Sequence, residues 1–249
     1  MTMMKAAVVH AFGQPLRIEE VPVPEVTPGQ VLVKVVASGV CHTDLHAADG
    51  DWPVKPTLPF IPGHEGVGFV AALGKGVKGI KEGDRIGVPW LHTACGHCEH
   101  CITGWETLCD EQQMTGYTVN GGYAEYVCVP RQNILPKPRS LSFEEAACLP
   151  LTFLTAWTML VRRAQLQAGE TVLVQAAGSG VGSAAVQIAK LHGAVVIATA
   201  STDEKLARAK ALGADHLINY ATHDFLTEVK RITQRQLVDV VFEHVGSTT

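Results

Sequence analysis

Residues 171–182, Thr-Val-Leu-Val-Gln-Ala-Ala-Gly-Ser-Gly-Val-Gly, decide the fold of the C-terminal part of this chain. The apolar run from Thr171 to Gln175 predicts a strand, and the spacing of apolar residues after the turn predicts a helix from Val181 to Lys190, ended at Gly193. Further strands are expected at 195–199, 216–219 and 237–242, and further helices at 203–212 and 225–232. This alternation predicts an α/β fold with a parallel, doubly wound sheet.

The turn inside this stretch consists of small residues, which let a backbone come close to a pyrophosphate at a helix N-terminus. The literal G-x-G-x-x-G fingerprint is broken, because Ser183 stands where the third glycine of a pattern that begins at Gly178 would be. By itself, the turn also fits simple tight packing. In its strand–turn–helix setting, with three further alternations, we expect it to bind a dinucleotide. The residues assigned to the cofactor are Ala177, Gly178, Ser179, Gly180, Val181 and Gly182.

Small hydroxyl residues stand where an NAD-selective site usually has an acidic residue, about 20 residues past the glycines. The sequence there is Thr199-Ala200-Ser201-Thr202. Ser201 and the nearby Lys205 can contact a 2′-phosphate, which favours NADP(H), whereas Asp203 is close enough to serve NAD. The cofactor is therefore written NAD(P), with NADP(H) as the expected preference.

The N-terminal part shows short strands separated by Pro and Gly, the pattern of a small β-barrel. Strands are expected at 5–10, 16–21, 31–36, 66–72, 84–88 and 123–129. Ser142 to Glu145 reads as a capping box that opens a short helix, and a longer helix is expected from Leu151 to Arg163. We place the domain boundary between residues 150 and 151, with domains 1–150 and 151–249.

Four cysteines of the N-terminal part have the spacing C-x2-C-x2-C-x7-C within a lobe at residues 91–112. Four thiolates close a tetrahedral shell around zinc, which makes a structural site that orders a segment poor in apolar residues. An iron–sulfur cluster would need a C-x2-C-x2-C-x3-C-P spacing, which this segment lacks. The expected structural-zinc ligands are Cys95, Cys98, Cys101 and Cys109.

A second group of candidate metal ligands lies in the expected loop Gly39-Val-Cys-His-Thr-Asp-Leu-His46 and in Gly63-His64-Glu65-Gly66. Cys41 supplies a thiolate and His64 an imidazole, both favoured by zinc, and the glycines let the backbone turn close to an ion. Alone, Cys41 fits a small buried apolar residue and His64 a satisfied turn histidine. Together they favour a second zinc site.

Composition limits the partner classes. The 249 residues carry a net charge of −4, which offers no general attraction for nucleic acid or an anionic membrane, so we expect a small-molecule partner. The start does not resemble a signal peptide, and no apolar run approaches the roughly 20 residues that span a bilayer. Seven cysteines in this arrangement suit metal binding in a reducing cytosol, and we expect a cytoplasmic protein.

These motifs together resemble the zinc-dependent medium-chain alcohol dehydrogenases, over the whole chain. The resemblance implies a GroES-like β-barrel catalytic domain followed by a Rossmann domain that binds nicotinamide cofactor. It implies that Cys41 and His64 bind the catalytic zinc, that Glu65 can enter its coordination shell, and that Asp44 supports His64.

The same resemblance implies the remaining roles. Thr43 would hydrogen-bond the alcohol oxygen, His46 would carry its proton toward solvent, and His42 would touch the pyrophosphate. Trp52 and Trp90 would line the substrate pocket, although either also fits plain core packing. The implied protein is an enzyme with two zinc ions per chain that interconverts primary or secondary alcohols and aldehydes or ketones with NAD(P), as a homo-oligomer.

The chain departs from that family pattern in three ways. Up to about Val129 it resembles bacterial propanol-preferring alcohol dehydrogenases, and from Leu135 onward the quinone-oxidoreductase branch. Leu151 stands where the family has its remaining catalytic-zinc cysteine, and Cys148 lies three residues before that position. The family's chain continues beyond Thr249, so we expect an incomplete Rossmann domain, with the last strand at an open apolar edge.

These departures keep two alternatives open. One is an NADPH-dependent quinone or enone reductase. The other is a zinc- and nucleotide-binding protein without turnover.

Overall fold

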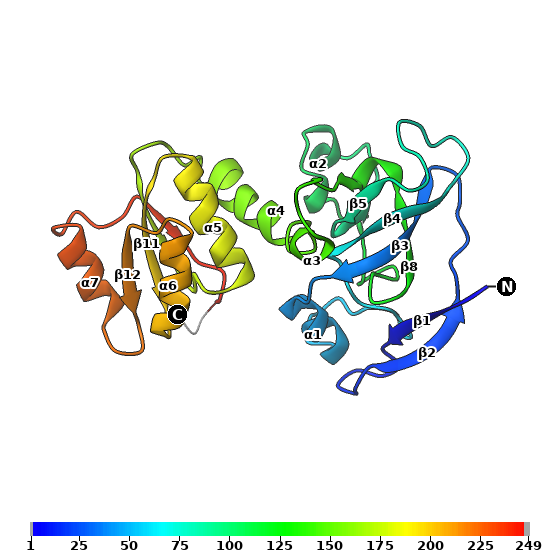
Figure 1. Ribbon diagram of the computed structural model, residues 1–249, viewed down its shortest axis with the longest axis horizontal. Coiled ribbons are helices and arrows are strands. Elements are labelled where there is room, and N and C mark those ends of the chain that lie inside the picture. The colour runs from blue at the N-terminus through cyan, green and yellow to red at the C-terminus, as the bar shows by residue number, and fades with distance from the viewer. Residues whose placement is uncertain (1, 247–249) are drawn as a thin grey trace. The chain divides into compact units, whose positions relative to one another are not determined.

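The computed structural model describes residues 2–246, which separate into two compact units that meet in the sequence between Leu151 and Thr152. Figure 1 labels the elements of both units. Each unit is described by itself.

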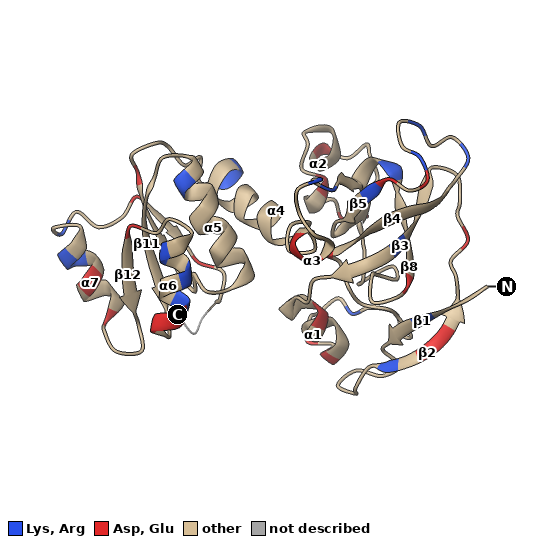
Figure 2. Cartoon of the chain, viewed as in Figure 1, with Lys and Arg blue, Asp and Glu red and all other residues tan. Residues whose placement is uncertain are grey.

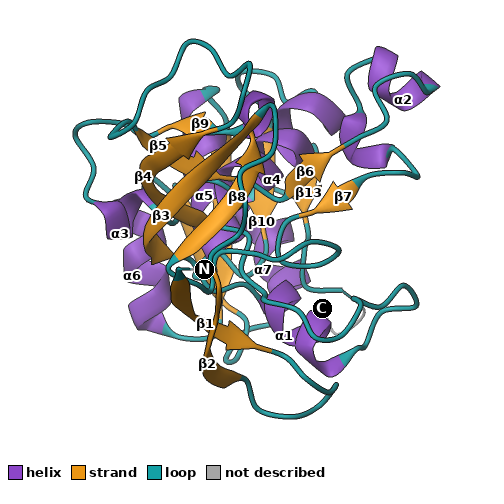
Figure 3. Cartoon of the chain, turned by 90° about the vertical axis from the view of Figure 1, so that its right-hand side faces the viewer, coloured by secondary structure: helices purple, strands orange, loops and turns teal. Residues whose placement is uncertain are grey.

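The first unit is built on a five-stranded antiparallel sheet of order β8-β3-β4-β5-β9 (Figures 1 and 3). Alternate residues of its strands, such as Val31, Val33 and Val129, point into one buried cluster, as the period of two requires. A hairpin and a two-stranded ribbon accompany this sheet. The strands are β3 (Gln30–Ser38), β4 (Gly66–Leu73), β5 (Arg85–Val88), β8 (Tyr126–Pro130) and β9 (Leu135–Pro136), the hairpin β1 (Met3–Val8) and β2 (Arg17–Pro22), and the ribbon β6 (Leu91–Thr93) and β7 (Gln113–Met114).

Short helices connect these strands. The expected capping box is present, since Ser142 Oγ accepts from the Glu145 amide at 3.1 Å and Glu145 Oε2 accepts from the Ser142 amide at 2.8 Å. The segment 39–46, expected to be a loop, instead begins a helix at His42, because Cys41 and Asp44 cap its first turn. The helices are α1 (His42–Asp49), α2 (Glu99–Ile102), α3 (Phe143–Ala146) and the 3-10 turns η1 (Glu106–Leu108) and η2 (Arg131–Asn133).

The second unit is a parallel sheet of order β12-β11-β10-β13, which is the predicted doubly wound arrangement. Val172 pairs with Val196 on one side and with Val240 on the other, so the first strand lies at the centre. The elements are β10 (Thr171–Val174), α5 (Gly180–Leu191), β11 (Val195–Ala200), α6 (Asp203–Ala211), β12 (His216–Asn219), α7 (Phe225–Ile232) and β13 (Val240–Phe242).

Two predicted elements of this unit differ from the structure. The helix expected from Leu151 to Arg163 is an α-helix, α4 (Thr152–Trp157), that continues as a π-helical segment, η3 (Thr158–Arg163). The predicted last strand begins three residues late, at Val240, because Leu237 has a left-handed φ of 67°. β13 is the outer strand of the described sheet, as expected, and Val241 is 56% exposed on it.

Candidate metal and cofactor sites

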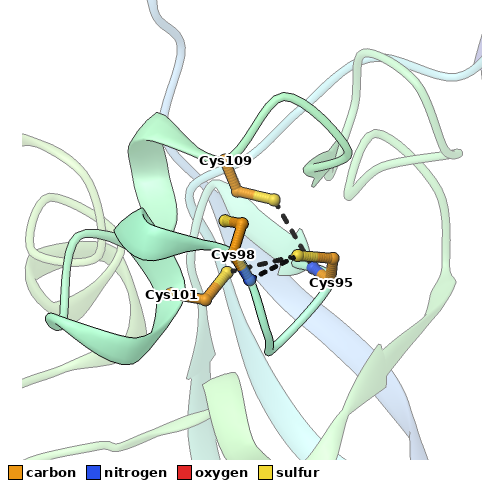
Figure 4. Close-up of side chains that lie close together, drawn as sticks. All are labelled: Cys95, Cys98, Cys101 and Cys109. Carbon is orange, nitrogen blue, oxygen red and sulfur yellow. Dashed lines mark hydrogen bonds between the residues drawn. The ribbon is translucent and has the colours of Figure 1, made fainter.

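The four cysteines of the lobe converge on one point (Figure 4). Their sulfur atoms all lie within 4.8 Å of one another, and Cys95 Sγ is 3.8 Å from Cys101 Sγ. A tetrahedron with zinc–sulfur bonds of about 2.3 Å has sulfur–sulfur edges of about 3.8 Å, so the spacing fits that ion. Exposed His97 and Glu111 also lie close to Cys95, but they share that cysteine with the four-thiol group.

Backbone amides in the lobe point at the sulfurs. The Cys98 amide donates to Cys95 Sγ at 3.3 Å, and the Cys95 amide donates to Cys109 Sγ at 3.5 Å. Amides at His97 and Cys98 lower the pKa of the Cys95 thiol well below its ordinary value. Burial raises the pKa of the Cys101 thiol to about 12, so in the chain without an ion the thiolate, which is the form that binds metal, is favoured at Cys95 and opposed at Cys101.

Asp44 joins the two segments that carry the second group of candidate ligands. Its Oδ2 accepts from the Cys41 amide at 3.1 Å and from the Tyr123 hydroxyl at 2.7 Å. Its Oδ1 accepts from the Gly63 amide at 2.9 Å and lies 3.1 Å from His64 Nδ1. The 4%-exposed carboxylate thus fixes the start of α1 and the loop before β4 together. Tyr123 was not among the predicted site residues.

His64 is 1% exposed, and among residues 2–246 neither of its ring nitrogens has a hydrogen-bond partner, although Nδ1 lies 3.1 Å from Asp44 Oδ1. Burial would lower the pKa of His64, but Asp44 and Cys41 outweigh it and raise that pKa to about 9 in the metal-free chain. Burial would raise the pKa of Cys41, but His64 and the Thr43 amide lower it. A thiolate beside a buried imidazole nitrogen that lacks a partner is a donor pair that fits zinc.

The third part of this predicted shell is less complete. Glu65 is buried, and its Oε1 accepts from the Leu151 amide at 3.0 Å. The exposed Cys148 thiol points to the Glu144 carbonyl at 3.6 Å. Within the described part of the chain, groups of three or more donor atoms packed within 4.8 Å occur in the cysteine lobe alone. The structure therefore brings Cys41 and His64 together but leaves their shell open.

Backbone contacts hold the His64 loop in place. A Cβ atom on Gly116 would lie 2.6 Å from the Gly63 carbonyl oxygen, and one on Gly121 would lie 2.1 Å from the same oxygen. Both distances are too short for any side chain. The turn at 116–121 and the loop before β4 therefore pack backbone to backbone beneath His64.

Three residues of the predicted active site, His46, Trp52 and Trp90, belong to a row of rings that ends at His64. Exposed His46 stacks 6.2 Å from Trp52, which lies 5.3 Å from Tyr117. Tyr117 lies 5.8 Å from Trp90, whose ring meets His64 edge-on at 4.9 Å. Sequence reasoning missed Tyr117, whose aromatic character alone gives no sign that it completes this row.

His42, His46 and Thr43 occupy the first turns of α1. His42 and His46 are exposed, with ring centres 6.4 Å apart, and Thr43 is half-buried. His46 Nδ1 pairs with Asp51 Oδ2 at 2.9 Å. The structure thus places one hydroxyl and two imidazoles on the helix that Cys41 caps.

The small-residue turn of the second unit opens α5 as predicted. Ser179 caps this helix, since its Oγ accepts from the Gly182 amide at 3.0 Å. A Cβ on Gly182 would lie 2.3 Å from the Ala176 carbonyl oxygen, so only glycine lets the helix start this close to β10. His244 Nε2 lies 2.8 Å from Ser179 Oγ, a contact that was not predicted.

The residues expected to select the cofactor lie beside this turn. The Lys205 side chain lies against Gly178, 2.9 Å from where a Cβ would be. Asp203 Oδ1 accepts from Asn219 Nδ2 at 2.8 Å, which directs that carboxylate toward the end of β12. Ser201 follows β11 directly. The Lys205 side chain therefore lies against the turn, whereas the Asp203 carboxylate is hydrogen-bonded to Asn219.

A barrel with soft metal donors and a parallel sheet with a pyrophosphate-type turn define a zinc-binding dehydrogenase. Sequence profiles agree: residues 27–139 match the alcohol dehydrogenase GroES-like domain, and residues 180–249 match the zinc-binding dehydrogenase domain. The chain belongs to the zinc-dependent medium-chain alcohol dehydrogenase family. In the described residues, no helix is long and apolar enough to cross a membrane.

Individual relatives support this assignment. The chain is 54% identical to an alcohol dehydrogenase of Rhizobium meliloti over 92% of its own length and 67% of the relative's. It is 42% identical to an NAD-dependent alcohol dehydrogenase of Sulfolobus acidocaldarius, over 98% of its own length and 71% of the relative's. A solved NAD-dependent alcohol dehydrogenase superposes with a TM-score of 0.92 at 46% identity, over 98% of this chain and 71% of that one. The chain thus spans about two thirds of the length of the relatives that it matches.

Proposed function

We propose that this chain carries the zinc and nicotinamide sites of an enzyme that interconverts alcohols and aldehydes or ketones by hydride transfer. The observation that carries this proposal is His64, whose buried Nε2 has no partner in residues 2–246 and lies beside the Cys41 thiol. A buried nitrogen without a partner costs about 1–3 kcal/mol, and a metal ligand bond removes that cost. A quinone reductase without zinc has no use for this arrangement.

The proposed roles follow from the chemistry of each group. Zinc held by Cys41 and His64, with Glu65 within reach, would supply Lewis-acid stabilisation of an alkoxide. The Thr43 hydroxyl accepts the alcohol proton and passes it on, and His46, which is exposed, releases it to solvent. The charge of Asp44, whose Oδ1 lies 3.1 Å from His64 Nδ1, would favour a proton on that nitrogen and leave Nε2 as the ligand atom. Trp52 and Trp90 line the proposed aromatic pocket for short substrates.

For the cofactor, the proposal is that the turn at 177–182 binds the pyrophosphate and that NADP(H) is preferred. The contact between Lys205 and Gly178 and the engagement of Asp203 by Asn219 support this preference. The relatives described as NAD-dependent favour the opposite choice. Titration of the chain with NADP+ and NAD+ separates the two, and tighter binding of NAD+ would reverse the preference.

The proposed setting is the cytoplasm, with a homo-oligomer acting on a small alcohol or aldehyde. None of the seven cysteines forms a disulfide, which is compatible with a reducing compartment.

One observation favours a second candidate, an NADPH-dependent quinone or enone reductase. Leu151 stands where the family resemblance implies a third zinc ligand. Its backbone amide donates a hydrogen bond to Glu65 Oε1. The two candidates differ in metal dependence. We therefore expect 1-propanol oxidation that follows zinc content and is lost in His64→Ala, while the matched His216→Ala variant keeps it.

Quinone reduction that persists in zinc-free protein would favour the second candidate. Zinc and nucleotide binding with neither activity would mean that this chain binds without turnover. Leu151→Cys tests the shell directly, since an added thiolate should tighten zinc binding at Cys41 and His64. Unchanged zinc affinity in that variant would show that residue 151 does not face the ion.

A further inference from the structure

A concave surface of the first unit, formed by residues that belong to neither proposed site, concentrates positive charge. Residues 75–85 and 131–139 hold seven of the chain's 20 Lys and Arg residues but two of its 24 Asp and Glu residues. The local balance of +5 contrasts with the net charge of −4 for the whole chain. Figure 2 shows blue segments around β5 and along the loop between β4 and β5.

A groove of about 630 Å³ lies within this surface. Its cationic residues are Arg85, Arg131, Lys137 and Arg139, and its apolar wall is formed by Ile80, Ile86, Ile134 and Pro136. Asp84 also lines it, but Lys81 Nζ already pairs with Asp84 Oδ1 at 2.6 Å. We call this feature the basic groove.

Lys137 gives the basic groove a buried positive charge. It is 8% exposed, and its Nζ donates to the carbonyl oxygens of Pro138 (3.0 Å) and Leu141 and lies 4.9 Å from the Phe143 ring centre. Across the described ranges it pairs with no carboxylate. Burying an ammonium without a counter-ion is costly, and an anion bound in the groove would offset that cost.

Two of the three guanidinium groups, those of Arg85 and Arg131, are held in place by contacts, whereas Arg139 is exposed. Arg85 lies over the rings of Phe69 and Phe143, at 5.9 Å and 5.8 Å from their centres. Arg131 Nε donates to the Lys78 carbonyl at 3.1 Å, which ties η2 to the loop after β4. A guanidinium held in this way presents a fixed fork of donors that matches the oxygens of a phosphate group.

We infer that the basic groove binds a small organic phosphate, with the phosphate on Arg85, Arg139 and Lys137 and the organic part on the apolar wall. Nucleic acid is the less favoured occupant, because a duplex presents an extended backbone, whereas this site is a short concavity with a buried ammonium. This inference is independent of the proposed dehydrogenase function, because no residue of the basic groove belongs to the zinc or cofactor sites.

Calorimetric titration of the zinc-loaded chain with phenyl phosphate tests the inference. Phenyl phosphate should bind at least three-fold more tightly than inorganic phosphate, because its ring adds contact with the apolar wall. Arg85→Gln and Arg139→Gln should each weaken phenyl phosphate binding at least five-fold and reduce the rise in melting temperature that it causes. Arg208→Gln, which removes the same charge from an exposed arginine of α6, should bind like the wild type.

Three results would overturn the inference. Equal binding by Arg85→Gln, Arg139→Gln and Arg208→Gln would place the phosphate elsewhere, including at the turn before α5. Absence of any phosphate binding, with salt-dependent binding of a 20-base-pair duplex that Arg85→Gln weakens, would make the surface a nucleic-acid contact. Absence of both would leave the basic groove as a solvated surface.

Discussion

Replacing Asp44 with Asn tests whether this carboxylate holds the Cys41 and His64 segments together. In the variant, Oδ1 can still accept from the Gly63 amide, but an amide nitrogen takes the place of Oδ2. The Cys41 amide and the Tyr123 hydroxyl, now 3.1 Å and 2.7 Å from the acceptor, would then face a donor. The pairing of a buried carboxylate with His64 is lost as well.

Breaking a buried, hydrogen-bonded charge pair costs about 3–5 kcal/mol, and we expect Asp44→Asn to lower the free energy of unfolding of the first unit by that amount. Tyr123→Phe removes one of the donors and should cost about 1–2 kcal/mol. Asp49→Asn, on the exposed side of the same helix, is the matched control and should stay within about 0.5 kcal/mol of the wild type.

The assay is urea denaturation at a fixed free zinc concentration, followed by the fluorescence of Trp52 and Trp90. Zinc content per chain, measured on the same samples, should fall in Asp44→Asn before the protein unfolds. An Asp44→Asn variant within about 1 kcal/mol of the wild type would refute the reasoning, because Asp44 would then be replaceable by any polar residue of its shape.

Three further predictions follow from other parts of the chain. Under mild chelation, the site at Cys41 and His64 should release zinc before the four-thiolate lobe does. Cys109→Ser should remove this difference in the order of release. Equal release of both ions from the wild type would contradict the prediction. Burial alone would raise the pKa of Asp215, but Lys190 and the Val196 amide lower it below its ordinary value of 3.8. The ionised carboxylate therefore stabilises the second unit above that pH, and the stabilisation is lost as the pH falls through the lowered pKa. Asp215→Asn should flatten the plot of melting temperature against pH below about pH 4, and an unchanged plot would count against this role. Lys205→Ala should weaken NADP+ binding about ten-fold and NAD+ binding much less, since one charged contact to the 2′-phosphate is lost; equal weakening of the two by calorimetry would show that Lys205 contacts only what they share.

Periodicity was a reliable guide to the second unit because its strands and helices repeat a simple alternation. The helix at Phe225–Ile232 has the predicted bounds, and the strand order places β10 at the centre as expected. The failures occurred where local backbone geometry overrode the pattern. A left-handed residue at Leu237 delays β13, and apolar spacing cannot distinguish the π-helical segment after Trp157 from a continued α-helix.

The sequence predicted which candidate ligands lie close together, but only part of what holds them there. Four cysteines at short spacing must lie close together, so their cluster could be expected from the sequence alone. Cys41 and His64 lie 23 positions apart; the family resemblance implied the support from Asp44, whereas the contact of Tyr123 with Asp44 is seen only in the folded chain. His244 beside Ser179 likewise depends on the parallel pairing of β10 with β13, which brings residues 65 positions apart together.

The backbone contact beneath His64 determines where this protein can accept sequence change. Because the Gly63 carbonyl fills the space that a side chain on Gly116 or Gly121 would need, those two positions have no tolerated alternative, although both lie outside the proposed chemistry. Thr118 Oγ1 accepts from the Met114 amide at 2.7 Å and Asn120 Oδ1 accepts from the Ile61 amide at 3.0 Å, so these two positions of the same turn are held by hydrogen bonds and not by a lack of space. A saturation library across residues 114–123 should therefore be depleted at these two glycines, and libraries that vary Trp52 and Trp90 should leave them unchanged.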